Sequence, residues 1–143
     1  MTDIAIGGAK RARRGYSFDE VAIVPSRRTR DPQAVSTTWT IDAYRFDTPI
    51  LAAPMDSVVS PRTAVTLAGL GVLAVLNLEG LWGRYEDPEP LLQEISRLDP
   101  AAVTPRMQEL YSAKPVDADL VVARIAELKA AGVTVAVATS PQG

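Results

Sequence analysis

Residues 49–76 read PILAAPMDSVVSPRTAVTLAGLGVLAVL, and this stretch determines the fold class. Its first part, 49–54, is a short apolar run between prolines, which is typical of a parallel strand buried on both faces. Ser60-Pro61 predicts a helix start, with serine as the N-cap and proline at the first helical position. Gly69 predicts the end of that helix, and 72–76 is a second apolar run. The stretch therefore predicts a compact βαβ unit.

The same alternation continues to the end of the sequence. It predicts a helix after Asp87-Pro88 that ends at Pro100, a short helix from Thr104-Pro105 to Tyr111, a helix capped by Asp117, and a strand over 133–138. Strands that alternate with helices indicate a parallel α/β sheet. Three such strands cannot close a barrel, and the sequence stops in a loop where another helix is expected. We therefore expect the first part of a longer protein.

The region before the sheet has a different character. Residues 1–48 read as an arm with short extended pieces, among them an apolar run at 21–24 and a loosely alternating stretch at 35–41. Residues 1–30 hold seven of the 15 Lys and Arg residues but only three of the 17 Asp and Glu residues. Such a basic arm suits nucleic acid or phosphate, or else is a solvated arm or a subunit contact, and we favour the last two.

Composition excludes several kinds of chemistry. The chain has 143 residues, of which 47% are hydrophobic and 22% charged, which is an ordinary globular balance. It holds neither cysteine nor histidine, so within this chain a disulfide, a thiolate nucleophile and a Cys or His metal site are excluded. We predict no metal site. The start is not a secretory signal, and no run approaches the roughly 20 apolar residues of a membrane span, so we expect a cytoplasmic protein.

Candidate binding residues follow the predicted strands, because ligands bind at the carboxyl ends of strands in parallel α/β folds. After the first strand come Ala53, Met55 and Asp56, where the methionine can lie against a planar heterocycle and the carboxylate can fix polar groups. The alternative is a methionine that fills the top of the core and an aspartate that caps nearby amides. After the third strand, Thr139 and Ser140 offer hydroxyls to a ribose or phosphate, or form a plain turn.

Two further features are explained by structure alone, without a binding role. Asn77 and Glu79 follow the second strand in the same way, but such polar side chains are often simply solvated. Residues 69–74 fit the pattern G-x-G-x-x-G/A, yet these glycines close a helix and open a strand. A dinucleotide fingerprint needs the reverse order, with the helix N-terminus facing the pyrophosphate. We therefore interpret them as a helix stop and a tight turn.

Four segments in this order resemble the IMP dehydrogenase / GMP reductase family. They are Tyr16 to Val21 with Ile23-Val24-Pro25, Pro49 to Ser57, Gly69 to Asn77, and Ala130 to Gly143. The resemblance is to the branch without the CBS insert, since only about 15 residues, 101–115, stand where a pair of CBS modules would lie. It implies a TIM (β/α)8 barrel, of which residues 1–48 are the N-terminal arm and 49–143 the first three βα units, incomplete as given.

The resemblance also implies a function. The family transfers hydride between a purine nucleotide (IMP, GMP or XMP) and NAD or NADP, and it assembles as a tetramer. Met55 matches a residue that packs on the purine, and Ser140 matches a serine on the cofactor side. Ala53 stands where IMP dehydrogenases usually have serine, and Thr139 where they have an aspartate that contacts the nicotinamide ribose. The alanine removes one polar contact at the substrate, and the threonine changes the residue that would contact the nicotinamide ribose.

The residues therefore support three function classes. The first is the N-terminal portion of a purine-nucleotide oxidoreductase, without a catalytic residue of its own, because the family's catalytic cysteine would lie beyond Gly143. The second is a non-catalytic nucleotide-binding or assembly relative, which the residues at Ala53 and Thr139 suggest. The third is a nucleic-acid-binding module that uses the basic arm. We favour the first, with no nucleic acid and no membrane as partner.

Overall fold

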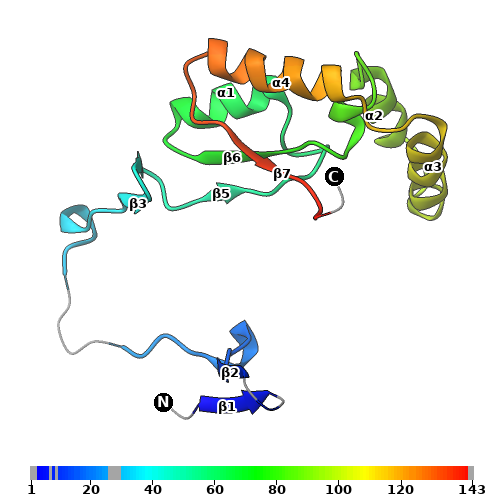
Figure 1. The fold of residues 1–143 in the computed structure, drawn as a ribbon. Helices are drawn as coiled ribbons and strands as arrows, with labels where there is room; N and C mark the ends of the chain where they lie inside the picture. Colours follow the sequence, from blue (N-terminus) through cyan, green and yellow to red (C-terminus); the bar gives the residue numbers. More distant parts are fainter. Residues whose placement is uncertain (1–2, 7, 9, 26–29, 142–143) are drawn as a thin grey trace. The chain divides into compact units, whose positions relative to one another are not determined.

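The computed structural model of the chain describes residues 3–6, 8, 10–25 and 30–141, so Arg27 and Arg28 of the basic arm and residues 142–143 lie outside the described residues. The chain divides into two compact units, Met1–Ser36 and Thr37–Gly143. Figure 1 draws the secondary structure of both units.

The first unit contains a short hairpin that the sequence did not predict. Strands β1 (Asp3–Ile6) and β2 (Lys10–Arg13) pair antiparallel. These four-residue strands lack the alternating apolar pattern of a half-buried strand, so periodicity gave no signal. Two short 3-10 helices follow, η1 (Phe18–Glu20) and η2 (Pro32–Ala34). A capping box between Ser17 and Glu20 and a 2.9 Å ion pair from Arg14 to Glu20 hold the first of them.

The second unit begins with a hairpin that the sequence analysis had grouped with the arm. Strands β3 (Trp39–Ile41) and β4 (Tyr44–Phe46) pair antiparallel. The strand expected over 35–41 is therefore too long, because Val35 is the C-cap of η2. The indole of Trp39 donates to the Thr48 carbonyl at 2.7 Å, and the Thr48 amide donates to the Gly71 carbonyl at 3.1 Å. These bonds join the hairpin to the segment that enters the sheet.

A three-stranded parallel sheet with helices on one face confirms the predicted α/β class. Strands β5 (Leu51–Ala52), β6 (Leu73–Asn77) and β7 (Ala136–Ala138) lie in the order β5-β6-β7. Helices α1 (Pro61–Gly69) and α4 (Ala118–Ala130) lie over the same face, as Figure 1 shows. Side chains from the sheet, from α1 and α4 and from adjoining segments form the core, namely Ala52, Val59, Ala64, Val72, Ala74, Leu76, Trp82 and Leu128. Among the described residues, β5 and β7 each pair on one side only.

The connection between β6 and α4 differs from its prediction. It holds η3 (Leu81–Gly83), α2 (Glu89–Ile95) and α3 (Pro100–Ala113). Pro100 begins α3 instead of ending α2, because Asp99 is the N-cap and accepts from the Ala101 amide at 3.0 Å. The start predicted at Thr104-Pro105 is therefore wrong, and Pro105 lies inside α3.

Candidate functional site

The loops that leave the three parallel strands meet at one edge of the sheet. Residues 53–57 follow β5, 78–80 follow β6 and 139–141 follow β7, and all three strands run in the same direction. The carboxyl edge of such a sheet is where ligands bind in α/β proteins. All five candidate binding residues therefore belong to the same edge of the second unit.

Met55 lies on the surface of this edge and does not belong to the core. The residue is 54% exposed, and Ala53 is also exposed. The loop around it is nonetheless built by backbone hydrogen bonds: the Met55 amide donates to the Ala53 carbonyl, and the amides of Val58 and Val59 donate to the Met55 carbonyl, all within 2.9 Å. The main chain thus holds Met55 in a defined turn while its thioether stays accessible.

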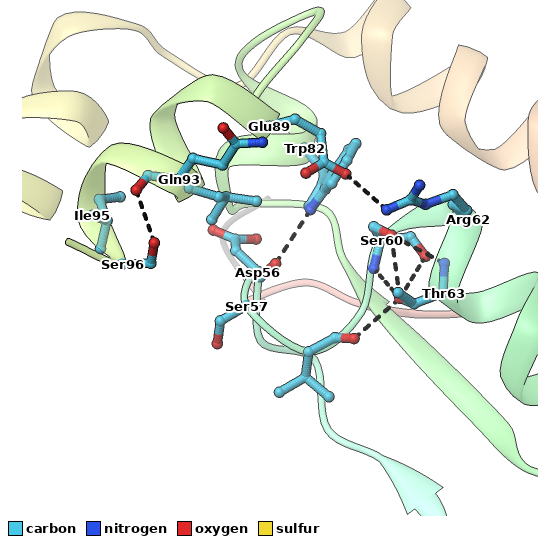
Figure 2. Close-up of a pocket in the computed structure, with 12 residues that line it drawn as sticks. Asp56, Ser57, Ser60, Arg62, Thr63, Trp82, Glu89, Gln93, Ile95 and Ser96 are labelled. Atoms are coloured by element: carbon cyan, nitrogen blue, oxygen red, sulfur yellow. Dashed lines mark hydrogen bonds and ion pairs between the residues drawn. The ribbon is translucent and has the colours of Figure 1, made fainter.

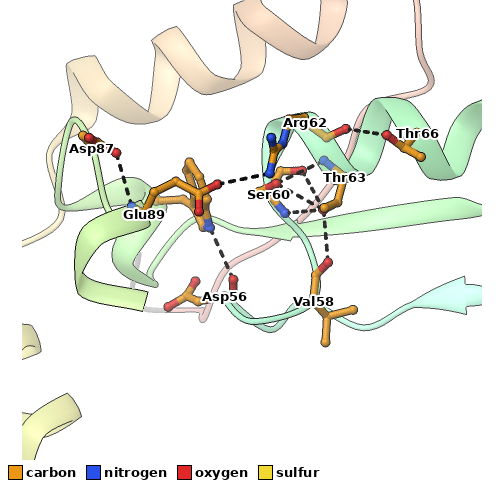
Figure 3. A network of polar contacts seen from close by, with 9 residues as sticks. Asp56, Val58, Ser60, Arg62, Thr63, Thr66, Asp87 and Glu89 are labelled. Atoms are coloured by element: carbon orange, nitrogen blue, oxygen red, sulfur yellow. Dashed lines mark hydrogen bonds and ion pairs between the residues drawn. The ribbon is translucent and has the colours of Figure 1, made fainter. Parts of the chain in front are cut away.

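Asp56 connects this turn to two distant segments. Its Oδ2 accepts from the Leu81 amide at 2.8 Å and from the Tyr111 hydroxyl at 3.0 Å. Its carbonyl accepts from the Trp82 indole at 3.5 Å, a contact drawn in Figures 2 and 3. These contacts fit the capping alternative for Asp56. Its Oδ1 is buried and finds no hydrogen-bond partner among the described residues.

Gly80 is required for this arrangement. A Cβ at Gly80 would lie 2.0 Å from Asp56 Oδ1 and 2.5 Å from its Oδ2, so the carboxylate occupies the space a side chain would need. The close approach lets Oδ2 reach the amide of Leu81, the next residue. Asp56, Gly80 and Leu81 therefore fix the β5 loop against the β6 loop.

Asp56 also changes the acidity of Tyr111. Burial, followed by the charge of Asp56 and the hydrogen bond to it, raises the pKa of Tyr111 to about 12. Tyr111 therefore ionises at a higher pH in the folded state than in the unfolded state, where tyrosine ionises near pH 10. Its contribution to the free energy of unfolding is fully present below about pH 10 and is lost as the pH rises through 12.

Asp56→Asn should lower the pKa of Tyr111 part of the way toward its ordinary value, because the negative charge disappears while burial remains. The phenolate absorbance measured during an alkaline titration reports this shift. Subtracting the titration of the Tyr111→Phe variant isolates the one phenol. An unchanged Tyr111 titration in Asp56→Asn would show that the carboxylate does not act on this group.

Glu79 joins the second and third loops. Its Oε1 accepts from the Thr139 hydroxyl at 2.9 Å and from the Ser140 amide at 2.6 Å. The hydrogen bond from the Ser140 amide is the main reason that the pKa of Glu79 lies below its ordinary value, with Thr139 and the charge of Arg84 adding to it. Glu79 thus links two loops through hydrogen bonds and is more than a solvated charge.

Arg84 and Tyr111 complete a chain of contacts that the sequence analysis missed. The Arg84 guanidinium donates to the carbonyls of Glu79, Tyr111 and Lys114 at 2.9, 3.1 and 2.6 Å. It also lies 5.0 Å over the Tyr111 ring, whose hydroxyl reaches Asp56. No local spacing could indicate these partners, since Arg84 is 27 residues from Tyr111 and Tyr111 is 55 from Asp56.

Two hollows flank this chain of contacts. One of about 380 Å³ lies between α2 and the start of α1, and Asp56 is one of its lining residues (Figure 2). Around it the α1 N-terminus is satisfied internally: Ser60 and Thr63 form a capping box, and Arg62 pairs with Glu89 at 3.9 Å (Figure 3). A helix end capped in this way offers few free amide donors.

The second hollow, of about 710 Å³, is lined by Thr139 and Ser140 together with Glu79, Arg84 and apolar residues of α4 and its neighbours. The structure thus brings Thr139 and Ser140 into one hollow and Asp56 into the other. Ala53 and Met55 line neither of these two hollows.

Fold and site together define an α/β protein whose candidate binding residues lie at the carboxyl ends of parallel strands. The model of the IMP dehydrogenase / GMP reductase domain matches residues 15–143. The chain therefore belongs to the IMP dehydrogenase / GMP reductase family.

Individual relatives agree with this assignment. The chain is 47% identical to an uncharacterized oxidoreductase of Mycobacterium tuberculosis and 45% identical to one of Mycolicibacterium smegmatis, over 97% of this chain and 38% of each relative. An inosine-5'-monophosphate dehydrogenase of Methanocaldococcus jannaschii is 32% identical over 46% of this chain and 13% of its own length. The crystal structure of an IMP dehydrogenase/GMP reductase-like protein from Corynebacterium glutamicum matches with a TM-score of 0.78 and 42% identity, over 98% of this chain and 38% of that chain.

These comparisons support the coarser part of the sequence interpretation. The family is the one that the four sequence segments indicated, and its relatives are named as oxidoreductases. The chain spans 38% of the length of the first of these relatives. Among the residues that the structure describes, no helix has both the length and the apolar character needed to cross a membrane.

Proposed function

We propose that this chain is the N-terminal portion of a purine-nucleotide oxidoreductase of the IMP dehydrogenase / GMP reductase type. It would form the arm and the first three βα units of a (β/α)8 barrel. The observation that carries the proposal is the exposed Met55 on a defined turn after β5, within the stretch that matches the family. The relatives are longer than this chain, which agrees with the view that the remaining units and the catalytic nucleophile lie elsewhere in the protein.

In this proposal the loops after β5 and β7 bind different parts of the substrate and cofactor. Met55 packs its polarisable side chain against the purine, beside Ala53, and Asp56 holds the turn in place through Leu81 and Tyr111. Thr139 and Ser140 lie on the cofactor side, in the 710 Å³ hollow whose apolar walls and few polar groups suit a nucleotide-sized ligand. NAD or NADP, when bound there, would supply or accept the hydride.

The second candidate is a non-catalytic nucleotide-binding or assembly relative of the same family. The alanine at 53 and the threonine at 139 favour it, because IMP dehydrogenases have a serine hydroxyl at the first place and an aspartate carboxylate at the second. Such a protein would bind purine nucleotide but show no hydride transfer. In both cases we propose a homo-oligomer, a tetramer when complete, with the basic arm at a subunit contact and not on nucleic acid.

Met55→Ala tests the purine contact in the full-length protein that carries this chain. The loss of one apolar and sulfur–aromatic contact should weaken binding of IMP, GMP or XMP by about 1–2 kcal/mol, roughly 5- to 30-fold in Kd. Isothermal titration calorimetry measures this.

A matched control is Leu70→Ala, which removes an exposed apolar side chain at the opposite end of the sheet and should leave nucleotide affinity unchanged. Equal affinities of the Met55→Ala and wild-type proteins would remove Met55 from the purine site.

A further inference from the structure

The β6–β7 ladder does not end at its last backbone pair. Val75, Leu76 and Asn77 pair in register with Ala136, Val137 and Ala138, and the Leu78 amide then donates to the Ala138 carbonyl at 3.1 Å. At the next position the acceptor is the carboxylate of Glu79, which takes the Ser140 amide at 2.6 Å. The Glu79 side chain thus replaces the backbone acceptor at the point where the segments after β6 and β7 leave the sheet.

The main chain of Glu79 is itself held by hydrogen bonds at both its amide and its carbonyl. The Glu79 amide donates to Asn77 Oδ1 at 3.1 Å, and the Glu79 carbonyl accepts from Arg84 Nε at 2.9 Å. Arg84 is fixed in turn by the carbonyls of Tyr111 and Lys114. Glu79 therefore presents Oε1 from a rigid main chain, which makes it a suitable anchor for a neighbouring loop.

The hydrogen bond to Glu79 also determines what Thr139 offers to a ligand. A hydroxyl has one proton, and the carboxylate at 2.9 Å is a stronger acceptor for it than the Ser140 carbonyl at 3.4 Å. With its proton committed to Glu79, the Thr139 oxygen has only lone pairs left. It can therefore accept from a donor on the ligand, such as a sugar hydroxyl or a carboxamide N–H.

We propose that Glu79 is a positioning residue for the cofactor-side loop. It fixes Thr139 and Ser140 at the wall of the 710 Å³ hollow and turns Thr139 into an acceptor for the ribose hydroxyls or the amide of a nicotinamide dinucleotide. This inference rests on the proposed function, because it assumes that the hollow takes a dinucleotide.

Steady-state kinetics of the full-length protein test it, with the KM for the dinucleotide and the KM for the purine nucleotide measured separately. Glu79→Ala should raise the dinucleotide KM about tenfold or more, the effect of losing charge-assisted hydrogen bonds, with the purine KM and kcat changed less than about twofold. Glu79→Gln should recover most of the affinity, because its amide oxygen still accepts from Ser140. Glu86→Ala is the matched control, since Glu86 is exposed and belongs to neither loop.

Thr139→Val extends the test by removing the hydroxyl that donates to Glu79 and, in this proposal, accepts from the ligand. It should raise the dinucleotide KM about threefold, and combining it with Glu79→Ala should add little, because the two side chains act through one bond. If Glu79→Ala does not fold, Thr139→Val carries the test alone.

The inference would be overturned by an unchanged dinucleotide KM, by equal rises in both KM values, or by effects of the two substitutions that multiply. These outcomes differ from a failure of the proposed function, in which the wild-type protein itself neither binds a dinucleotide nor turns over. That result would remove the inference as well.

Discussion

Residues 1–143, purified as an isolated polypeptide, are expected to aggregate or to form edge-to-edge oligomers. Strands β5 and β7 are the two edges of the sheet, and both are apolar, without a charge to prevent pairing with other chains. Helices α1 and α4 cover one face only (Figure 1), and Leu51 of β5 is 51% exposed. In a closed barrel further strands would pair with both edges and an opposite wall would cover the inner face.

Sedimentation velocity combined with thermal unfolding measures this behaviour. We expect heterogeneous sedimentation, a broad transition and binding of a hydrophobic dye, while the full-length protein that carries the chain serves as the folded control. A soluble monomer with one sharp cooperative transition would mean that the three-stranded unit is closed on itself. The partial-barrel account would then have to be abandoned.

Gly83→Ala should destabilise the full-length protein by about 3 kcal/mol or more. A Cβ at Gly83 would lie 2.0 Å from the backbone oxygen of Leu78, so the clash cannot be relieved by rotating a side chain. The Gly83 carbonyl also accepts from the Asp117 amide at 2.8 Å, which ties η3 to the N-cap of α4. Relief of the clash must therefore move either the end of β6 or the start of α4.

Urea unfolding of the full-length protein gives the change in free energy. Gly69→Ala is the matched control, because nothing lies within 4 Å of a Cβ built there and Gly69 is the last residue of α1. That substitution should be neutral or stabilise by up to about 1 kcal/mol. Similar stabilities for the Gly83→Ala and Gly69→Ala proteins would show that η3 does not pack against Leu78 as described.

The elements with strong local signals were the ones that the sequence predicted well. Ser60-Pro61 begins α1 and Asp117 caps α4 as expected, because a capping side chain and a fixed proline φ act within one turn. The same logic failed at Pro100 and Pro105. Two proline signals five residues apart competed, and the cap at Asp99 decided which of them begins the helix.

The candidate site shows where local patterns stop being informative. The position of Met55 after a strand could be predicted, since strand order and direction place it at the carboxyl edge of the sheet. The expected burial of that strand on both faces was wrong, because Leu51 of β5 is half exposed. The anchoring of Asp56 by Tyr111 and of Ser140 by Glu79 could not, because these partners lie 55 and 61 residues apart. Such contacts arise only when the βα units stack side by side.

Hydride transfer by the full-length protein tests the central claim most directly. The protein is incubated with IMP and an oxidised nicotinamide dinucleotide, and in parallel with GMP and a reduced one, while the absorbance of the reduced nicotinamide is followed. The account predicts turnover in one of the two mixtures, dependent on the purine nucleotide and diminished by Met55→Ala. A folded protein that neither binds a purine nucleotide nor changes the nicotinamide absorbance would contradict it.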